Sequence, residues 1–258
     1  MLMSKVELQL FEEVYPQVVP MGEGVVNYAS GHALGQGPVI APHRAPSETR
    51  PPQERVVLVW EHVLRRPPDL RTIGPLLGVN VVAPTWFSLA GDQGNLVDRA
   101  DPAYVTWAHQ RGYGVWGVVN NAFDPDRSFD PDRTRAVLTS VERRERLIQQ
   151  ILLFCQTYRL DGINLDFEHV YPQDRDQLTQ LAREVGSLAR EMGLVVSIDV
   201  TPRSTRPNGS LCYDRRALAN VLDYVILMAY DEHPAGSPVA GPVASLPWVQ
   251  TALLGVLE

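Results

Sequence analysis

From Val56 to the end of the chain, short apolar runs rich in β-branched residues alternate with stretches of helical periodicity. The apolar runs occupy 56–60, 79–83, 114–119, 160–167, 194–200 and 223–230. Such nearly continuous runs are typical of parallel strands that are buried on both faces. Between them, apolar residues recur at helical spacing in 141–158 and 174–192, and Ser245 is placed as the N-cap of a last helix. The alternation predicts a parallel α/β fold.

Polar and aromatic residues gather just after nearly every predicted strand. They are Trp60 to His62, Trp86, Asn120 and Asn121, Asp166 and Glu168, Asp199 to Arg203, and Tyr230 to His233. In a barrel the carboxyl ends of all strands converge on one mouth, whereas an open sheet uses only those near its switch point. Because no Gly-rich phosphate loop follows the first run, we expect a (β/α)8 TIM-type barrel.

The chain shows six strand–helix units, whereas a complete barrel has eight. We therefore expect a barrel over residues 56–258 that is truncated after the sixth β/α unit. Residues 1–55 are rich in Gly and Pro and predict an extended or small β-rich appendage that ends in a Pro-rich linker.

Composition excludes several classes of function. The formal net charge of −7 argues against a nucleic-acid partner, which needs a basic surface. No apolar run reaches the roughly 18 residues that span a bilayer, so no membrane association is expected. Acidic residues interrupt the stretch at the amino terminus where a signal peptide has its apolar core. The two cysteines, Cys155 and Cys212, imply no disulfide framework, and Cys155 lies on the apolar stripe of a predicted helix as a buried thiol.

The segment 160–168 places acids inside an apolar strand. Strand side chains alternate between faces, so Asn164, Asp166 and Glu168 share one face while apolar residues occupy the other. Two carboxylates at i and i+2 lie roughly 6–7 Å apart at their Cα atoms. Like charges that close raise one pKa, which lets a carboxyl group donate a proton near neutral pH. A pair of acids alone would also fit a solvated loop, but the alternation with Asn164 favours a catalytic site.

The stretch DGINLDFE resembles the DxxDxDxE signature of family 18 glycoside hydrolases, the chitinase-like enzymes. Asp161, Asp166 and Glu168 match the signature, whereas Asn164 replaces its second Asp. The residues Met228 to Asp231 look like the M-x-Y-D element of the same family at the end of the sixth strand. Further runs over 56–258 look most like the bacterial branch associated with spore germination and cell-wall lysis.

The resemblance implies a retaining mechanism in which the 2-acetamido oxygen of the substrate attacks the anomeric carbon. Glu168 is then the acid that protonates the leaving oxygen and later activates water. Asp166 orients the acetamido N–H and stabilises the cationic intermediate, and Tyr230 hydrogen-bonds the acetamido oxygen. Asn164 cannot carry a charge, so the acid set is smaller than in classical chitinases.

Further residues are expected at the substrate site. They are Asp161, Asn164, Trp60, Trp86, Asn120, Asp199, Met228 and Asp231. Asp161 is out of phase with the other motif residues and is also expected to buttress the strand end. Trp60 and Trp86 fit sugar-stacking platforms and rim packing equally well, because aromatic rings serve both purposes. The last strand is expected over 223–230, so by alternation Met228 and Tyr230 share one face and both can point inward.

These residues predict a glycosidase that cleaves β-1,4-linked N-acetylglucosamine polymers, with peptidoglycan favoured over chitin. A non-catalytic, chitinase-like carbohydrate-binding protein is the alternative. A metal-dependent hydrolase is disfavoured because neither HxH nor HExxH spacing occurs, and no metal or other cofactor is expected. The expected partner is the polysaccharide itself, the oligomeric state stays open, and the resemblance implies a secreted, cell-wall or spore-associated protein.

Overall fold

The computed structural model of the chain describes residues 55–63, 74–123, 128–204, 209–234 and 236–257. The chain divides into two units, Met1–Ala45 and Pro46–Glu258, and every described residue belongs to the second. The predicted appendage and linker of residues 1–55 therefore lie outside the described residues, apart from Arg55.

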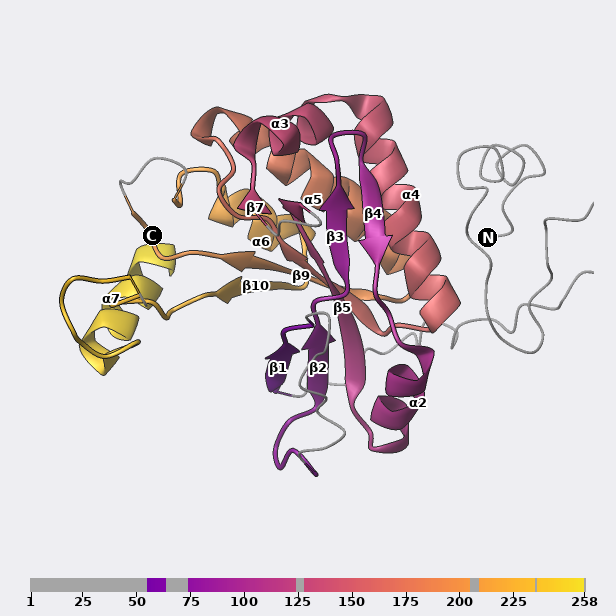
Figure 1. The fold of residues 1–258 in the computed structure, drawn as a ribbon, viewed down its shortest axis with the longest axis horizontal. Helices are drawn as coiled ribbons and strands as arrows, with labels where there is room; N and C mark the ends of the chain where they lie inside the picture. Colours follow the sequence, from indigo (N-terminus) through magenta and orange to yellow (C-terminus); the bar gives the residue numbers. More distant parts are fainter. Residues whose placement is uncertain (1–54, 64–73, 124–127, 205–208, 235, 258) are drawn as a thin grey trace, which may run out of the picture. The chain divides into compact units, whose positions relative to one another are not determined.

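A row of parallel strands forms the centre of this second unit (Figure 1). Its members, in spatial order, are β1 (Leu58–Glu61), β2 (Val81–Pro84), β5 (Gly114–Asn120), β8 (Gly162–Asp166), β9 (Val195–Val200) and β10 (Tyr224–Leu227). Neighbouring strands pair in parallel throughout, so the spatial order is the sequence order. The sheet curls as half of a barrel, with β1 and β10 as the outer strands of the described row. The prediction of a parallel barrel-type sheet is confirmed.

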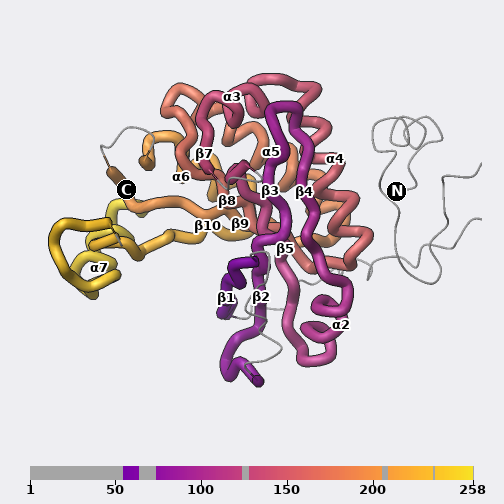
Figure 2. Tube along the Cα trace, in the orientation of Figure 1, coloured from indigo at the N-terminus to yellow at the C-terminus, as the bar shows by residue number. Residues whose placement is uncertain are grey.

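Helices follow the strands, and most of them pack against the sheet, whereas the last helix lies beyond the end of β10 in Figure 2. They are α2 (Pro102–Gln110), α3 (Pro131–Thr139), α4 (Val141–Tyr158), the short η2 (Pro172–Asp174), α5 (Arg175–Glu191), α6 (Arg215–Val221) and α7 (Leu246–Leu257). The two long helices predicted from their apolar periodicity are confirmed as α4 and α5. Cys155 lies buried on the inner face of α4 as a free thiol, as expected.

Two hairpins interrupt the expected alternation of strands and helices. β3 (Phe87–Ala90) and β4 (Asn95–Asp98) pair antiparallel immediately after β2, and β3 also extends the sheet beside β5. β6 (Ala122–Phe123) and β7 (Ser128–Phe129) form a smaller hairpin after β5. Both hairpins follow carboxyl ends of parallel strands and therefore rise at the same edge of the sheet.

Close backbone packing in the sheet depends on Gly162 at the start of β8. A Cβ atom at this position would lie 2.7 Å from the carbonyl oxygen of Val195 and 2.7 Å from the ring of Trp116. The absence of a side chain lets β8 approach β9 beneath the indole ring. Trp116 is 4% exposed and belongs to the core. Among the described residues, no helix is both long and apolar enough to cross a bilayer.

Candidate active site

The carboxyl ends of β1, β8, β9 and β10 bring together most of the predicted polar residues. Asp166 is the last residue of β8, and Asp199 lies near the end of β9. The indole N–H of Trp60, on β1, donates a hydrogen bond of 3.0 Å to Oδ1 of Asn164 in the middle of β8. These residues come from strands that are far apart in the sequence, and the curl of the sheet gathers them on one inner face.

Asp166 is a largely desolvated carboxyl group. Burial, followed by the nearby charge of Glu168, raises the pKa of Asp166 to about 7. Its Oδ1 is buried without a hydrogen-bond partner among the described residues. A buried carboxyl with an unsatisfied oxygen is costly unless it holds a proton or meets a donor from a ligand.

Glu168 lies two residues beyond the end of β8, so the alternation of the strand does not position it. Its backbone is held by the side chain of Asn121, which lies just after β5. Asn121 Oδ1 accepts from the backbone N–H of Glu168 at 2.9 Å, and Asn121 Nδ2 donates to the Glu168 carbonyl oxygen at 2.7 Å. Nδ2 of Asn121 also donates to Thr134 on α3, at 3.1 Å. This two-point contact fixes the backbone of the predicted acid.

A second contact holds the residue before Glu168. The hydroxyl of Tyr213, buried just ahead of α6, donates to the carbonyl oxygen of Phe167 at 2.8 Å. Neither Asn121 nor Tyr213 was among the predicted site residues. Asn121 could have been inferred from its place after a predicted strand, whereas no sequence signal marks Tyr213.

The electrostatic environment of Glu168 suits a proton donor. Burial raises the pKa of Glu168, the adjacent His169 lowers it, and Asp231 raises it. A carboxyl group with a raised pKa keeps its proton closer to neutral pH, which general acid catalysis requires.

Tyr230 faces the same acids from the segment after β10. Its side chain is 42% exposed, and burial together with Asp166, Asp199 and Glu168 raises its pKa to about 12. Because β10 ends at Leu227, the expected strand alternation of Met228 with Tyr230 is wrong. Met228 is 8% exposed and packs inward, whereas Tyr230 is open to a ligand and remains a neutral hydrogen-bond donor over the physiological range.

Left-handed backbone follows two of these residues directly. His169, after Glu168, has φ of 53°, and Asp231, after Tyr230, has φ of 66°. Residues other than glycine rarely adopt this conformation, and it concentrates at functional sites. Each turn changes the chain direction immediately beyond a predicted catalytic side chain.

Asn164 is completely buried and connects three strands. Besides accepting from Trp60, its Nδ2 donates to Ser197 Oγ and to Asp199 Oδ1, both at 2.9 Å. The indole nitrogen can only donate, so Oδ1 of Asn164 must face Trp60 and the amide nitrogen must face β9. Asn164 thus supports the site from beneath and offers no surface to a substrate.

Three other predicted substrate residues need correction. Asp161 lies before β8, at the end opposite the acids, where its carboxylate accepts from the Val115 N–H and pairs with His109, each at 2.8 Å. These contacts fit the expected buttressing of the strand end and leave Asp161 away from the acids. Trp86 is 2% exposed against Tyr104 and offers no face to a sugar. Asn120 is 4% exposed and accepts from the Ala122 N–H, so it shapes the turn after β5.

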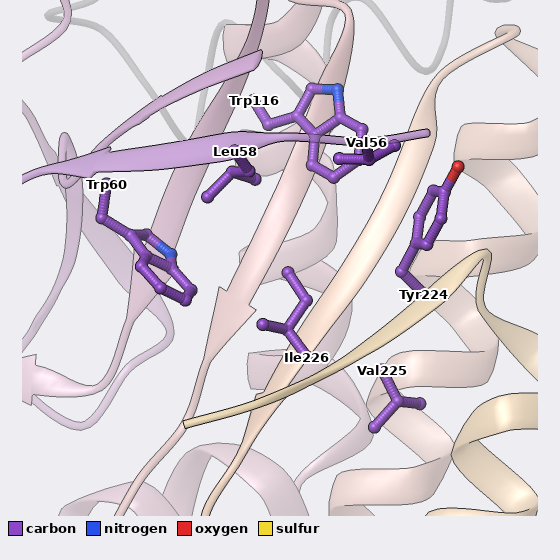
Figure 3. A pocket seen from close by; sticks show the side chains of 7 residues that line it. All are labelled: Val56, Leu58, Trp60, Trp116, Tyr224, Val225 and Ile226. Carbon is purple, nitrogen blue, oxygen red and sulfur yellow. The ribbon is translucent and has the colours of Figure 1, made fainter. Parts of the chain in front are cut away.

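An open cavity of about 380 Å³, lined mostly by apolar side chains, includes residues of β1 and β10 in its wall. Figure 3 shows Leu58 and Trp60 of β1 and Ile226 of β10 directed into this space. Trp60 is 37% exposed, so part of its ring is open while its nitrogen is engaged by Asn164. Of the two tryptophans predicted as sugar platforms, only Trp60 retains an accessible face.

A parallel half-barrel with acids gathered at the carboxyl ends of its strands is the arrangement of a barrel enzyme, and barrel glycosidases use such acids. No group of three or more His, Cys, Asp or Glu side chains in the described part of the chain could hold a metal ion. Residues 132–253 match the family described as "Glycosyl hydrolases family 18". Residues 132–253 therefore carry the similarity to glycosyl hydrolase family 18 that the motifs indicate.

Known proteins with related sequences agree with this assignment. The chain is 27% identical over 179 residues to "Uncharacterized glycosylase YvbX" of Bacillus subtilis. This alignment covers 68% of the chain and 51% of that protein. It is 29% identical over 116 residues to "Cortical fragment-lytic enzyme" of Bacillus subtilis, covering 44% and 27% of the two chains. The chain thus spans about half, or less, of the length of these relatives.

The fold is similar to that of solved chitinases. A crystal structure of a chitinase from Chromobacterium violaceum superposes with a TM-score of 0.68 at 25% identity, covering 79% of this chain and 64% of that one. The relatives are thus glycosidases by fold and by sequence.

Proposed function

We propose that this chain hydrolyses β-1,4-linked N-acetylglucosamine polymers, with peptidoglycan favoured over chitin, by a retaining and substrate-assisted mechanism. One observation carries the proposal. Asp166 and Glu168, both with raised pKa values, lie at one edge of the sheet with the exposed Tyr230. The relatives named as cortical fragment-lytic enzymes favour a bacterial cell-wall glycan.

The proposed roles follow from the position and charge of each group. Glu168, fixed through its backbone by Asn121, has a raised pKa and donates its proton to the glycosidic oxygen. The same carboxylate then accepts a proton from the water that completes hydrolysis. Tyr230 donates a hydrogen bond to the acetamido oxygen as this oxygen attacks the anomeric carbon.

Asp166 is proposed to receive the acetamido N–H. Its buried Oδ1 has no partner among the described residues, so a donor from the substrate would satisfy it. As positive charge develops on the acetamido group, an ionised Asp166 stabilises that charge in a desolvated site, where electrostatic interactions are strong. Trp60 is proposed to stack against a sugar with its open face, and Asp231 to contribute to the rim.

The remaining assignments are part of the same proposal. Residues 56–258 are proposed to form the catalytic barrel unit, and residues 1–55 a separate appendage. A relative named as a putative sporulation-specific glycosylase supports association with the spore or the cell wall. A polysaccharide is the proposed partner.

The experiment compares wild type with Glu168→Gln on purified peptidoglycan and on chitin oligomers. Glutamine preserves size but cannot donate the proton, so kcat should fall by roughly 10²–10⁴-fold while oligomer binding survives. The matched control is Glu145→Gln, at an exposed position on α4, which should leave kcat unchanged. Full activity of Glu168→Gln would refute the role of this residue.

The second candidate is a carbohydrate-binding protein without turnover. The departure of Asn164 from the family signature favours it, because one acid of the motif is absent. Wild-type protein that binds N-acetylglucosamine oligomers and releases no product would support this candidate over hydrolysis.

A further inference from the structure

Asn164 on β8 stands where the family signature has an acid, and the neighbouring strand β9 carries an acid of its own, Asp199. β8 and β9 pair in parallel with Asn164 opposite Ser197 and Leu165 opposite Ile198. Continuation of this register by one residue would bring Asp166 opposite Asp199, and the charge of Asp166 acts on Asp199. Neighbouring strands lie about 4.8 Å apart, and residues two apart share a face, so both acids lie side by side on the inner face.

Both carboxyl groups are shielded from solvent: Asp199 is 2% exposed, and Oδ1 of Asp166 is buried. Asp199 Oδ1 accepts from Asn164 Nδ2 at 2.9 Å, which leaves Oδ2 for a second interaction. On the other side, the buried Oδ1 of Asp166 has no hydrogen-bond partner among the described residues. A single proton between the two carboxyl groups gives this oxygen one hydrogen bond and leaves its second lone pair for a donor from the substrate.

Two adjacent buried carboxyl groups share protons because two charges at this separation repel strongly. Burial, and then the charge of Asp166, raises the pKa of Asp199 to about 8, against the lowering effect of Asn164. Glu168 raises it further, and the hydroxyls of Tyr213 and Tyr230 face the same acids from the segments before α6 and after β10. The surroundings therefore favour a pair with one negative charge.

We propose that Asp199 is a positioning residue that holds the proton shared with Asp166 and supplies, from β9, the acid that Asn164 lacks. The O–H of Asp199 donates to the Asp166 carboxylate, and the pair carries one net negative charge. No bond other than this hydrogen bond changes, and Asn164 orients Asp199 through its amide nitrogen. The contribution of this pair to catalysis rests on the proposed function, whereas the sharing of the proton does not depend on it.

The test is a pH titration of the carboxyl carbons of ¹³C-aspartate-labelled protein by NMR. In wild type, the resonances of Asp166 and Asp199 should each follow two common steps, because the pKa values of an interacting pair belong to both members. In Asp199→Asn, the step that Asp166 shares with Asp199 should disappear. The control Asp176→Asn, at an exposed position on α5, should retain both steps.

An exchange of the two residues provides a second arm. The double variant Asn164→Asp with Asp199→Asn moves the acid to β8, beside Asp166, and should restore a two-step titration of Asp166. A purely structural role of Asp199 would not be recovered by an acid on the other strand. A preserved amide spectrum establishes that each variant is folded.

Turnover gives a readout that is independent of the titration. Asp199→Ala should lower kcat by roughly 10–100-fold, since it removes a hydrogen bond to a charged group, and Asp199→Asn should lower it less because its amide can donate. A one-step titration of Asp166 in wild type overturns the inference whatever the turnover. Two-step behaviour in a protein that cleaves no glycan leaves the shared proton standing and refutes the proposed hydrolysis instead.

Discussion

Replacement of Asn121 by alanine tests whether the backbone of Glu168 must be held in place. The wild-type side chain makes two hydrogen bonds to Glu168, at 2.7 and 2.9 Å, and a third to Thr134. All three are lost in the variant, and the Glu168 backbone groups have no substitute from alanine. At about 1 kcal/mol for each hydrogen bond, with a further cost for polar groups left buried, the free energy of unfolding should fall by roughly 2–4 kcal/mol.

The same substitution should slow catalysis beyond its effect on folding. Displacement of a catalytic group by about 1 Å can cost on the order of 100-fold in rate. Urea unfolding gives the stability, and kcat is measured at a temperature where the variant remains folded. The control is Asn220→Ala, at an exposed position on α6, which should change neither quantity. An Asn121→Ala protein with wild-type stability and wild-type kcat would refute the positioning role.

Two further predictions concern stability. Gly162→Ala should destabilise the chain by more than about 2 kcal/mol, because the new Cβ meets a backbone oxygen at 2.7 Å. The control Gly255→Ala in α7, with contacts no closer than 3.7 Å, should be neutral or stabilising. Similar unfolding midpoints for both variants would contradict this. Asp166 and Asp199 have folded-state pKa values of about 7 and 8, above the ordinary value, so their contribution is full at low pH and is lost as pH rises through 7 to 8. The difference in free energy of unfolding between Asp199→Asn and wild type should therefore shift in favour of the variant by roughly 1–3 kcal/mol from pH 5 to pH 8. An equal difference at both pH values would contradict the burial of charge.

The order of the strands was predictable because each parallel strand reads as an apolar run, and the inner strands β2, β5, β8 and β9 are buried on both faces. The hairpin β3–β4 was missed although the sequence marks its turn. Gly91 and Gly94 lie between two short strands, and both adopt positive φ values of 68° and 81°. A search for strand pairs around such glycines would have found it.

The site was predictable only where strand alternation governs it. Asp166 is the last residue of β8 and faces inward as expected, whereas Glu168 lies beyond the strand and depends on Asn121, 47 positions away in the sequence. The role of Trp86 could not be assigned from sequence, because a tryptophan at a strand end can stack against a sugar or pack in the core. Its contact with Tyr104 places it in the core. The pairing of Asp199 with Asp166 required the register of β8 and β9.

The most direct test of substrate-assisted hydrolysis compares two forms of one glycan. The chain is incubated with N-acetylglucosamine oligomers and with the same oligomers after removal of the N-acetyl groups, and reducing ends are counted over time. Because only the acetylated glycan carries the internal nucleophile, the account predicts cleavage of that form and none of the de-N-acetylated form above background. Equal rates of cleavage for the two forms would contradict it.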